Sequence, residues 1–535
     1  MNWMKAIKLL DCTLRDGGYI NDWEFGHSVV TGTYKRLDAA GVDYIEIGFL
    51  DDRRPFDINR TIQPNTESYN IVFAGIEKKH AIPVAMIDYG TCNIANIGSC
   101  DSTFIDGIRV IFKKEKIDNA LPFCKAIKEK GYKLFIQAIS ITAYSDLEML
   151  EYIQKINDIK PYAFSIVDTY GLLDSRKLTN YFNLMNNNLD PDIRIGYHAH
   201  NNFQLAFSNS IKFLAMETNR TIVVDSTVYG MGKSAGNTAS ELIAMHMNQR
   251  YGTNYDIDQF LEILDTDLMA FYQKHYWGYK YNFYISAMQN CHPNYVQFLL
   301  DKKTLSVTSI NQILSTIPDD IKLLYNQKYI ENAYIQYQSQ SIDDASAISE
   351  LSTILEKKDV LLLGPGNSLG SDEDKILRYI TDNKPVVISV NFEPSRYNCD
   401  FVFVSNAKRY SKLADATEKV SNAQLITTSN ITLFDRQTEY VLNFSSLIEK
   451  NGIESDNALL LAVAFLQRVG AKSVILAGFD GFSAGTTDYY DSKYAFAGNN
   501  DYSISSNEVT AEGLKRLSEG IDIKFLTKSL YEKSV

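Results

Sequence analysis

Short apolar runs alternate with longer amphipathic stretches between residue 6 and about residue 250. There are eight such runs, at 6–14, 42–49, 82–88, 107–112, 132–140, 163–169, 193–200 and 221–228. The stretches between them, such as 116–131, repeat apolar residues every three or four positions, as amphipathic helices do. Eight strand–helix units in roughly 250 residues match the size of a (β/α)8 TIM barrel. We therefore predict an α/β fold with a TIM barrel over residues 1–250.

Polar residues stand at the end of almost every run, and they separate the barrel from its alternative, a doubly wound sheet. The residues in question are Asp11, Asp16, Glu46, Asp88, Gln137, Asp168, His198, His200 and Asp225. A TIM barrel collects its chemistry at the carboxyl ends of its strands. The barrel is favoured for this reason, and its catalytic site is expected at that end.

The remainder of the chain predicts two further parts. Residues 251–345 are rich in aromatic residues and helical in period, which predicts a helical domain packed on the barrel. From residue 356 the strand–helix alternation returns, which predicts a C-terminal Rossmann-like α/β domain over 356–535 with a mainly parallel sheet. Its apolar runs are 359–369, 385–392, 400–406, 423–429, 473–482 and 521–527.

Composition narrows the classes of partner. Lys and Arg number 53 against 65 Asp and Glu, a net charge of −12, which argues against nucleic acid and anionic membrane as partners. The apolar runs are too short to span a bilayer, and the N-terminus lacks the apolar core of a signal peptide. The six cysteines form no CxxC pair, as in reduced thiols. We expect a cytoplasmic protein, and a homo-oligomer by default.

The strongest chemical signal is His198-Ala199-His200 at the end of a predicted strand. Alternate strand residues point to one side, so the two imidazoles can share one metal ion, with Asp16 as a third ligand. Two histidines and one carboxylate leave positions open for a substrate and suit Mn²⁺ or Mg²⁺ more than structural zinc. The alternative is that the two histidines make hydrogen bonds only.

Arg15 directly precedes Asp16 in the sequence. The glycine-rich segment 229–237 follows the last predicted strand. The Arg15 guanidinium can stabilise an oxyanion, or form a salt bridge with Glu46, and the two roles are compatible. The segment 229–237 opens a helix and lacks the Walker A pattern, so it does not indicate an NTPase. Asn237, at its end, is alternatively a helix cap.

Segments 11–18, 198–202 and 230–237, together with Glu46, resemble the metal-dependent TIM-barrel lyase and synthase superfamily that contains hydroxymethylglutaryl-CoA lyase. Within it the chain is most similar to pyruvate aldolases such as 4-hydroxy-2-oxovalerate aldolase. The resemblance implies a metal bound by Asp16, His198 and His200, with Asn237 at or near its coordination sphere. It also implies that Arg15 stabilises an enolate and that Glu46 completes an Asp-Arg-Glu set with Asp16 and Arg15.

One departure concerns the catalytic base. These aldolases carry a histidine where this chain has Tyr19, whose ordinary pKa of about 10 requires help from the metal or Arg15. A metal-bound water is the other candidate. Further candidates for contact with the substrate are Gln137, Asp168 and Tyr284.

The expected function is that of a divalent-metal-dependent (class II) aldolase joining pyruvate and an aldehyde into a 4-hydroxy-2-oxo acid, or cleaving that acid. The first alternative is a Claisen-type synthase or lyase acting on an acyl-CoA. The second is a nucleotide-sugar binding protein or transferase whose barrel is only structural.

The C-terminal part carries a weaker set of candidate residues. They follow predicted strands and comprise Gly364, Gly366, Asn367, Ser368, Asn406 and Asp480. This part loosely resembles the Rossmann-like domain of pterin pyrophosphokinase-like and sialyltransferase-like proteins, which implies a nucleotide or nucleotide-sugar ligand. A tight strand–helix turn explains the glycines equally well.

Overall fold

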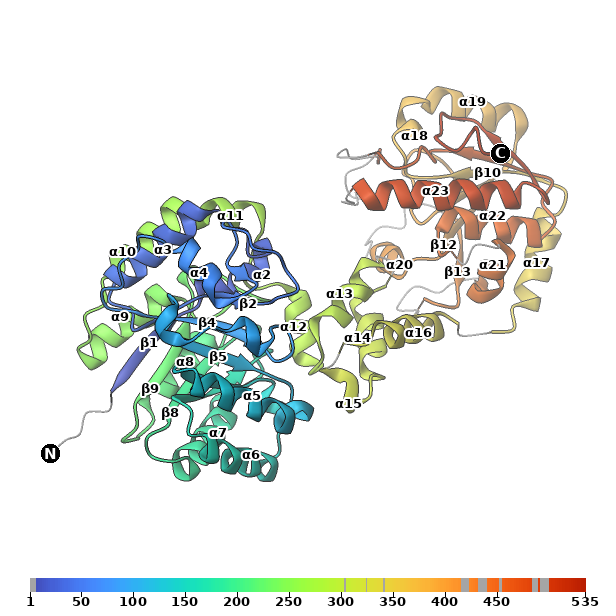
Figure 1. The fold of residues 1–535 in the computed structure, drawn as a ribbon. Helices are drawn as coiled ribbons and strands as arrows, with labels where there is room; N and C mark the ends of the chain where they lie inside the picture. The colour runs from blue at the N-terminus through green and yellow to red at the C-terminus, as the bar shows by residue number, and fades with distance from the viewer. Residues whose placement is uncertain are drawn as a thin grey trace. The chain divides into compact units, whose positions relative to one another are not determined.

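The computed structural model describes residues 6–302, 305–323, 325–339, 342–414, 423–431, 440–451, 455–483, 489–490 and 500–535. The chain divides into two compact units (Figure 1). The first comprises residues 1–293 with 322–324, and the second comprises 294–321 with 325–535.

The first unit is a closed parallel barrel, and each of the eight predicted runs supplies one strand. The strands are β1 (Ile7–Asp11), β2 (Tyr44–Leu50), β4 (Ile82–Asp88), β5 (Gly107–Ile111), β6 (Lys133–Ala138), β7 (Ala163–Asp168), β8 (Arg194–Ala199) and β9 (Ile222–Ser226). Strand β1 pairs with both β2 and β9, which closes the barrel, and the short β3 (Ile62–Gln63) extends β2 on one side. The predicted TIM barrel is confirmed.

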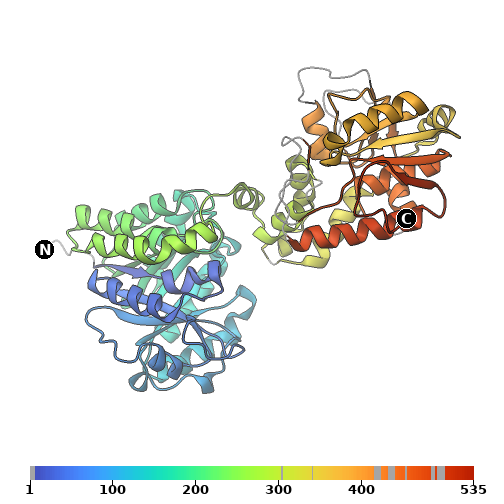
Figure 2. The same ribbon diagram turned by 90° about the horizontal axis from the view of Figure 1, so that it is seen from above.

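The helices that follow the strands surround the barrel, as the two views show (Figure 2). They are α3 (His27–Ala39), α4 (Thr66–Val72), α5 (Ile117–Glu129), α6 (Asp146–Ile159), α7 (Ser175–Asn188), α8 (Ala206–Ala215) and α9 (Ser240–Tyr251). Helix α5 is typical, because Ala120, Cys124 and Ile127 recur at helical spacing and form its buried side. Helix α6 starts at a capping box between Ser145 and Glu148.

More helices follow the barrel within the first unit. Helix α10 (Ile257–Ile263) packs on α3, and α11 (Met269–Lys274) and α12 (Tyr281–Met288) come next. The ring of Phe271 lies 5.6 Å from that of Phe25, so aromatic packing joins this segment to the N-terminal part of the barrel.

The second unit contains a parallel sheet preceded by helices. The helices are α13 (Pro293–Asp301), α14 (Val307–Ser315), α15 (Asp319–Lys322), α16 (Gln327–Gln338) and α17 (Ala345–Leu355). The strands are β10 (Asp359–Leu363), β11 (Val386–Val390), β12 (Phe401–Val404), β13 (Gln424–Thr428), β14 (Tyr440–Leu442), β15 (Ser473–Ala477) and β16 (Asp522–Phe525). They lie in the order β14-β13-β12-β11-β10-β15-β16. From β10 the chain first adds strands on one side as far as β14, and then adds β15 and β16 on the other side of β10.

Each of the six runs expected in the C-terminal part contains one of these strands. Alternate side chains of β10 enter different cores: Val360 and Leu362 pack with α17, α21 (Phe444–Asn451), α22 (Ala458–Arg468) and α23 (Asn500–Leu517), and Leu361 and Leu363 pack with α19 (Glu373–Asn383). Helices therefore cover both faces of the sheet. The domain boundaries at residues 250 and 356 stay predictions.

Among the described residues, no helix is both long enough and apolar enough to cross a membrane.

Candidate metal centre

Asp16, His198 and His200 meet at the carboxyl end of the barrel. Asp16 ends the short helix α1 (Thr13–Asp16) after β1, and the two histidines lie at the end of β8 and just after it. Their ligand atoms all lie within 4.8 Å of one another, and all three side chains are buried. The Nε2 atoms of His198 and His200 are 3.2 and 3.8 Å from Asp16 Oδ2. Three donors of this kind around one point fit a divalent cation.

The outer nitrogen of each imidazole is held by a partner, which leaves Nε2 facing Asp16. His198 Nδ1 lies 3.1 Å from Asp225 Oδ2, and His200 Nδ1 lies 3.1 Å from the backbone oxygen of Asp168. Both partners accept hydrogen bonds, so the proton resides on Nδ1 when the imidazole is neutral. Such partners fix the tautomer and orientation of metal-binding histidines.

Burial and neighbouring charges shift the pKa values of these groups. Burial alone raises the pKa of Asp16, but Arg15 and the histidines outweigh it and hold that pKa well below its ordinary value. Burial lowers the pKa of His200 to about 3, so its imidazole is neutral near pH 7. Its Nε2 atom is buried without a hydrogen-bond partner, which costs free energy unless a cation occupies the position. This orphaned nitrogen is the observation that makes the residues fit a metal.

The loop after β9 places Asn237 beside this centre. Residues His200 and Asn237 form an isolated β-bridge, and the buried Asn237 Oδ1 lacks a hydrogen-bond partner, as a prospective ligand would. Gly232, in the same loop, lies close to both candidate ligands. A Cβ atom there would stand 2.0 Å from Asn237 Nδ2 and 2.8 Å from Asp16 Oδ1. The close approach of this loop therefore requires glycine.

Arg15 is fixed by two carboxylates. Its Nε donates to Glu46 Oε2 and its Nη1 to Asp16 Oδ2, both at 2.7 Å. Burial alone would lower the pKa of Arg15, but these carboxylates raise it. The salt bridge to Glu46 considered from the sequence is thus present, and Nη2 has no hydrogen-bond partner among the described residues.

Arg109, on β5, was missed by the sequence analysis. It is 1% exposed, and it donates to Glu46 Oε2 at 3.0 Å, to Gln137 Oε1 at 3.1 Å and also to Asp225 Oδ2. It completes a ring of contacts that runs Asp16, Arg15, Glu46, Arg109, Asp225, His198 and back to Asp16. A lone arginine inside the apolar run 107–112 was the available signal.

Tyr19 lies at the edge of the same centre. Its ring centroid is 4.8 Å from that of Trp23 and 6.2 Å from that of Phe49, and Lys233 Nζ lies 5.3 Å from its centroid. Burial raises the pKa of the Tyr19 phenol above its ordinary value, despite Arg15. The phenol is therefore protonated at neutral pH and suited to donate a hydrogen bond.

The other three substrate-binding candidates lie in different surroundings. Gln137, inside the barrel, accepts from Arg109. The Asp168 carboxylate accepts from the backbone amides of Leu172 and Leu173 at 2.7 and 3.0 Å, and burial raises its pKa to about 6. Tyr284, on α12, is 43% exposed, with its ring 6.1 Å from that of Phe203. Their roles toward a substrate stay predictions.

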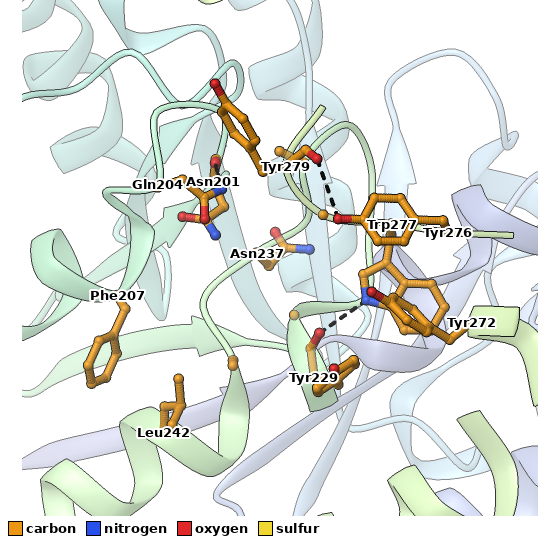
Figure 3. Close-up of a pocket in the computed structure, with 14 residues that line it drawn as sticks. Asn201, Gln204, Phe207, Tyr229, Asn237, Leu242, Tyr272, Tyr276, Trp277 and Tyr279 are labelled. Atoms are coloured by element: carbon orange, nitrogen blue, oxygen red, sulfur yellow. Dashed lines mark hydrogen bonds between the residues drawn. The ribbon is translucent and has the colours of Figure 1, made fainter. Parts of the chain in front are cut away.

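A pocket of about 300 Å³ lies next to Asn237 (Figure 3). Its polar lining includes the amides Asn201, Gln204 and Asn237, and its aromatic lining comprises Phe207, Tyr229, Tyr272, Tyr276, Trp277 and Tyr279. Trp277 Nε1 donates to the backbone oxygen of Tyr229 at 3.0 Å, which holds the aromatic segment over the β9 loop. None of the 14 lining residues is charged.

In the second unit, the loops after β10 and β15 pack directly on each other. A Cβ atom on Gly366 would lie 2.5 Å from the backbone oxygen of Gly478, so close loop packing accounts for this glycine. The Asp480 carboxylate accepts from the Ser368 amide at 2.8 Å and also from the Ser368 hydroxyl.

Asn406 Oδ1 accepts from the Lys408 amide at 2.9 Å, as a cap of α20 (Ala407–Ala414) does. Nucleotide binding in this unit, like a homo-oligomeric state, stays a prediction.

The HMGL-like family model matches residues 6–266 of the chain. An oxaloacetate decarboxylase of Mycobacterium tuberculosis (strain ATCC 25618 / H37Rv) is 21% identical over 277 residues, 49% of this chain and 76% of the relative. A 4-hydroxy-2-oxovalerate aldolase of Shewanella halifaxensis (strain HAW-EB4) is 23% identical over 269 residues, 50% of this chain and 78% of the relative. The crystal structure of hydroxymethylglutaryl-CoA lyase from Pseudomonas aeruginosa covers 50% of this chain and 94% of its own, with 18% identity and a TM-score of 0.42.

Residues 6–266 therefore match the HMGL-like family, which confirms, for the N-terminal part of the chain, the resemblance inferred from the sequence motifs. The similarity to lyases and aldolases supports an enzyme with carbon–carbon lyase activity.

Proposed function

We propose that the barrel is a divalent-metal-dependent pyruvate aldolase, which forms or cleaves a 4-hydroxy-2-oxo acid from pyruvate and an aldehyde. The observation that carries this proposal is the Nε2 of His200, which is buried without a hydrogen-bond partner beside His198 and Asp16. Next to it, Arg15 uses Nε and Nη1 in hydrogen bonds and keeps Nη2 for a substrate. Mn²⁺ or Mg²⁺ suits this set of nitrogen and oxygen donors.

Asp16, His198 and His200 would hold the cation, with Asn237 Oδ1 as a further donor. When bound, the cation supplies Lewis-acid polarisation of the 2-oxo group. Arg15 has its Nε and Nη1 occupied by Glu46 and Asp16, which leaves its Nη2 to donate to the developing enolate oxygen.

In the cleavage direction, the C3–C4 bond of the 4-hydroxy-2-oxo acid breaks. Its electron pair passes into the enolate, the 4-hydroxyl gives its proton to a base and becomes the aldehyde carbonyl, and protonation of the enolate at C3 gives pyruvate. In the condensation direction the new alkoxide takes up a proton. We assign that donation to Tyr19, whose phenol lies within the electrostatic influence of Arg15 and Asp16, and in cleavage the same oxygen, as the phenolate, accepts the proton.

The first experiment follows the pyruvate methyl protons by NMR in D₂O with Mg²⁺ and the full chain. Exchange is expected with the wild-type protein and is expected to be lost in His198→Ala and Asp16→Asn. Tyr19→Phe is expected to slow addition of pyruvate to an aldehyde by about 10²-fold. Full exchange in either ligand variant, with metal absent from the protein, would overturn the assignment.

Two further reactions distinguish the proposed aldolase function from its alternatives. Release of free thiol from acetyl-CoA with a 2-oxo acid would indicate the Claisen-type alternative. Loss of CO₂ from oxaloacetate, the reaction that one relative's name describes, proceeds through the same pyruvate enolate. Decarboxylation without aldehyde addition would limit the function to that reaction.

A further inference from the structure

Lys233 is a cation that the site leaves without a counter-ion. It belongs to the loop after β9, and its backbone amide donates to Asp16 Oδ1 at 3.0 Å. Within the described part of the chain, its ammonium group forms no ion pair or hydrogen bond, whereas Arg15 and Arg109 each contact two carboxylates. Its ammonium nitrogen lies 5.3 Å from the centroid of the Tyr19 ring.

The charges of the metal centre balance without this ammonium group. The ring around the centre holds the three carboxylates of Asp16, Glu46 and Asp225 and two guanidinium groups, which leaves one negative charge in excess. A divalent cation reverses this to one positive charge, which the carboxylate of a 2-oxo acid neutralises. The charge of Lys233 then remains uncompensated, and a half-buried cation favours an anionic partner.

Neighbouring groups do not supply that partner. Asp88 is the next acidic residue that acts on Lys233 after Asp16, and the charges of Lys116, Lys113, Arg53 and Asp51 act on Asp88 in turn. Burial and the charges of Lys233 and Lys113 also lower the pKa of His292 to about 4. Among the described residues, no acidic side chain therefore forms an ion pair with Lys233.

The position of Lys233 distinguishes the two substrates. The 2-oxo acid is expected at the ligand atoms of the metal centre and at Arg15, whereas Lys233 Nζ lies over Tyr19, the proton donor assigned to the aldehyde oxygen. The pocket beside Asn237 has no charged lining residue, so no side-chain charge in it would compensate a charged substrate (Figure 3).

Resting on the proposed aldolase function, we propose that the ammonium group of Lys233 binds an anionic group on the aldehyde, a carboxylate or a phosphate. This residue then selects anionic aldehydes over neutral ones.

The experiment measures kcat/KM for addition of pyruvate to two pairs of aldehydes with Mn²⁺ and the full chain. D-Glyceraldehyde 3-phosphate is compared with D-glyceraldehyde, and succinic semialdehyde with butanal, so the two pairs distinguish phosphate from carboxylate. The wild type is expected to prefer the anionic member of at least one pair by 10-fold or more. Lys233→Met should reduce that preference by about 10- to 100-fold, the usual range for a lost charge-assisted hydrogen bond, and Lys233→Arg should retain most of it.

Lys212→Met is the matched control, because it removes the same charge from an exposed position near the end of α8. Its preference should equal that of the wild type. If Lys233→Met does not fold, as judged by circular dichroism, Lys233→Gln takes its place.

Several results would overturn the inference. They are a wild type without preference, an equal loss for anionic and neutral aldehydes in Lys233→Met, or a raised KM for pyruvate in the aldehyde-free exchange reaction with the preference intact. Absence of pyruvate exchange in the wild type would instead reject the proposed function, and the inference with it. Exchange without anionic preference would reject the inference alone.

Discussion

Arg109 offers the sharpest test of how the barrel interior is built. Its guanidinium is buried and contacts Glu46 and Asp225, which are 0% and 2% exposed. Arg109→Met keeps much of the volume but removes the charge. Glu46 then retains Arg15 and Asp225 retains His198, yet both carboxylates lose a buried cation.

Removing one partner of a buried ion pair costs about 3–5 kcal/mol, because the remaining charge stays desolvated. Total unfolding free energies are only about 5–15 kcal/mol, so the barrel of Arg109→Met should be strongly destabilised. Asp225 also orients His198, so metal affinity should fall by about 10- to 100-fold.

Tryptophan fluorescence during urea denaturation measures this loss in the relevant unit. Trp23 and Trp277 lie in the first unit, and the sequence of the second unit contains no tryptophan. The control is Arg176→Met, which removes an exposed arginine from α7 and should change the unfolding free energy by less than about 0.5 kcal/mol.

A double variant tests the cause of the loss. Adding Glu46→Gln to Arg109→Met removes one of the two carboxylates left short of a cation, so the pair should be less destabilised than the sum of the single changes. Strict additivity, or an Arg109→Met protein as stable as Arg176→Met, would refute the reasoning.

Three further predictions concern the metal centre. The unfolded chain protonates His200 at about pH 6.5 but the folded one only at about pH 3, so metal-free protein should lose about 1.4 kcal/mol per pH unit on acidification between these values. Urea titrations of wild type and His200→Gln at several pH values check this, since the variant should show a shallower slope. Chelation should lower the melting temperature and Mn²⁺ at about 100 times its Kd should restore about 2.7 kcal/mol, with no response in His200→Gln by calorimetry. Gly232→Ala should lose metal in elemental analysis, because its Cβ would meet Asn237 and Asp16, whereas Gly32→Ala, whose Cβ would meet Asp267 Oδ2 only at 3.9 Å, should keep it.

The local pattern of the sequence was sufficient for the barrel. A strand needs about five residues of period-two or continuous apolar character, and all eight runs had it. The candidate ligands followed for the same reason, since His198 and His200 are alternate residues at the end of one predicted strand and Asp16 closely follows another. In the C-terminal part the six runs likewise contain strands, and β14, three residues long, was too short to give a signal.

The tertiary structure decided which side chains support those ligands. Arg109 and Asp225 are 116 residues apart, and Lys233 is 217 residues from the carboxylate that its amide contacts. Such pairs arise from closure of the barrel, which no local period encodes. The same holds for Gly366 in the second unit, which packs on a loop more than one hundred residues away, at Gly478. Apolar periodicity acts over a few residues and fixes the strands, whereas the balance of buried charge is set only when distant strand ends meet.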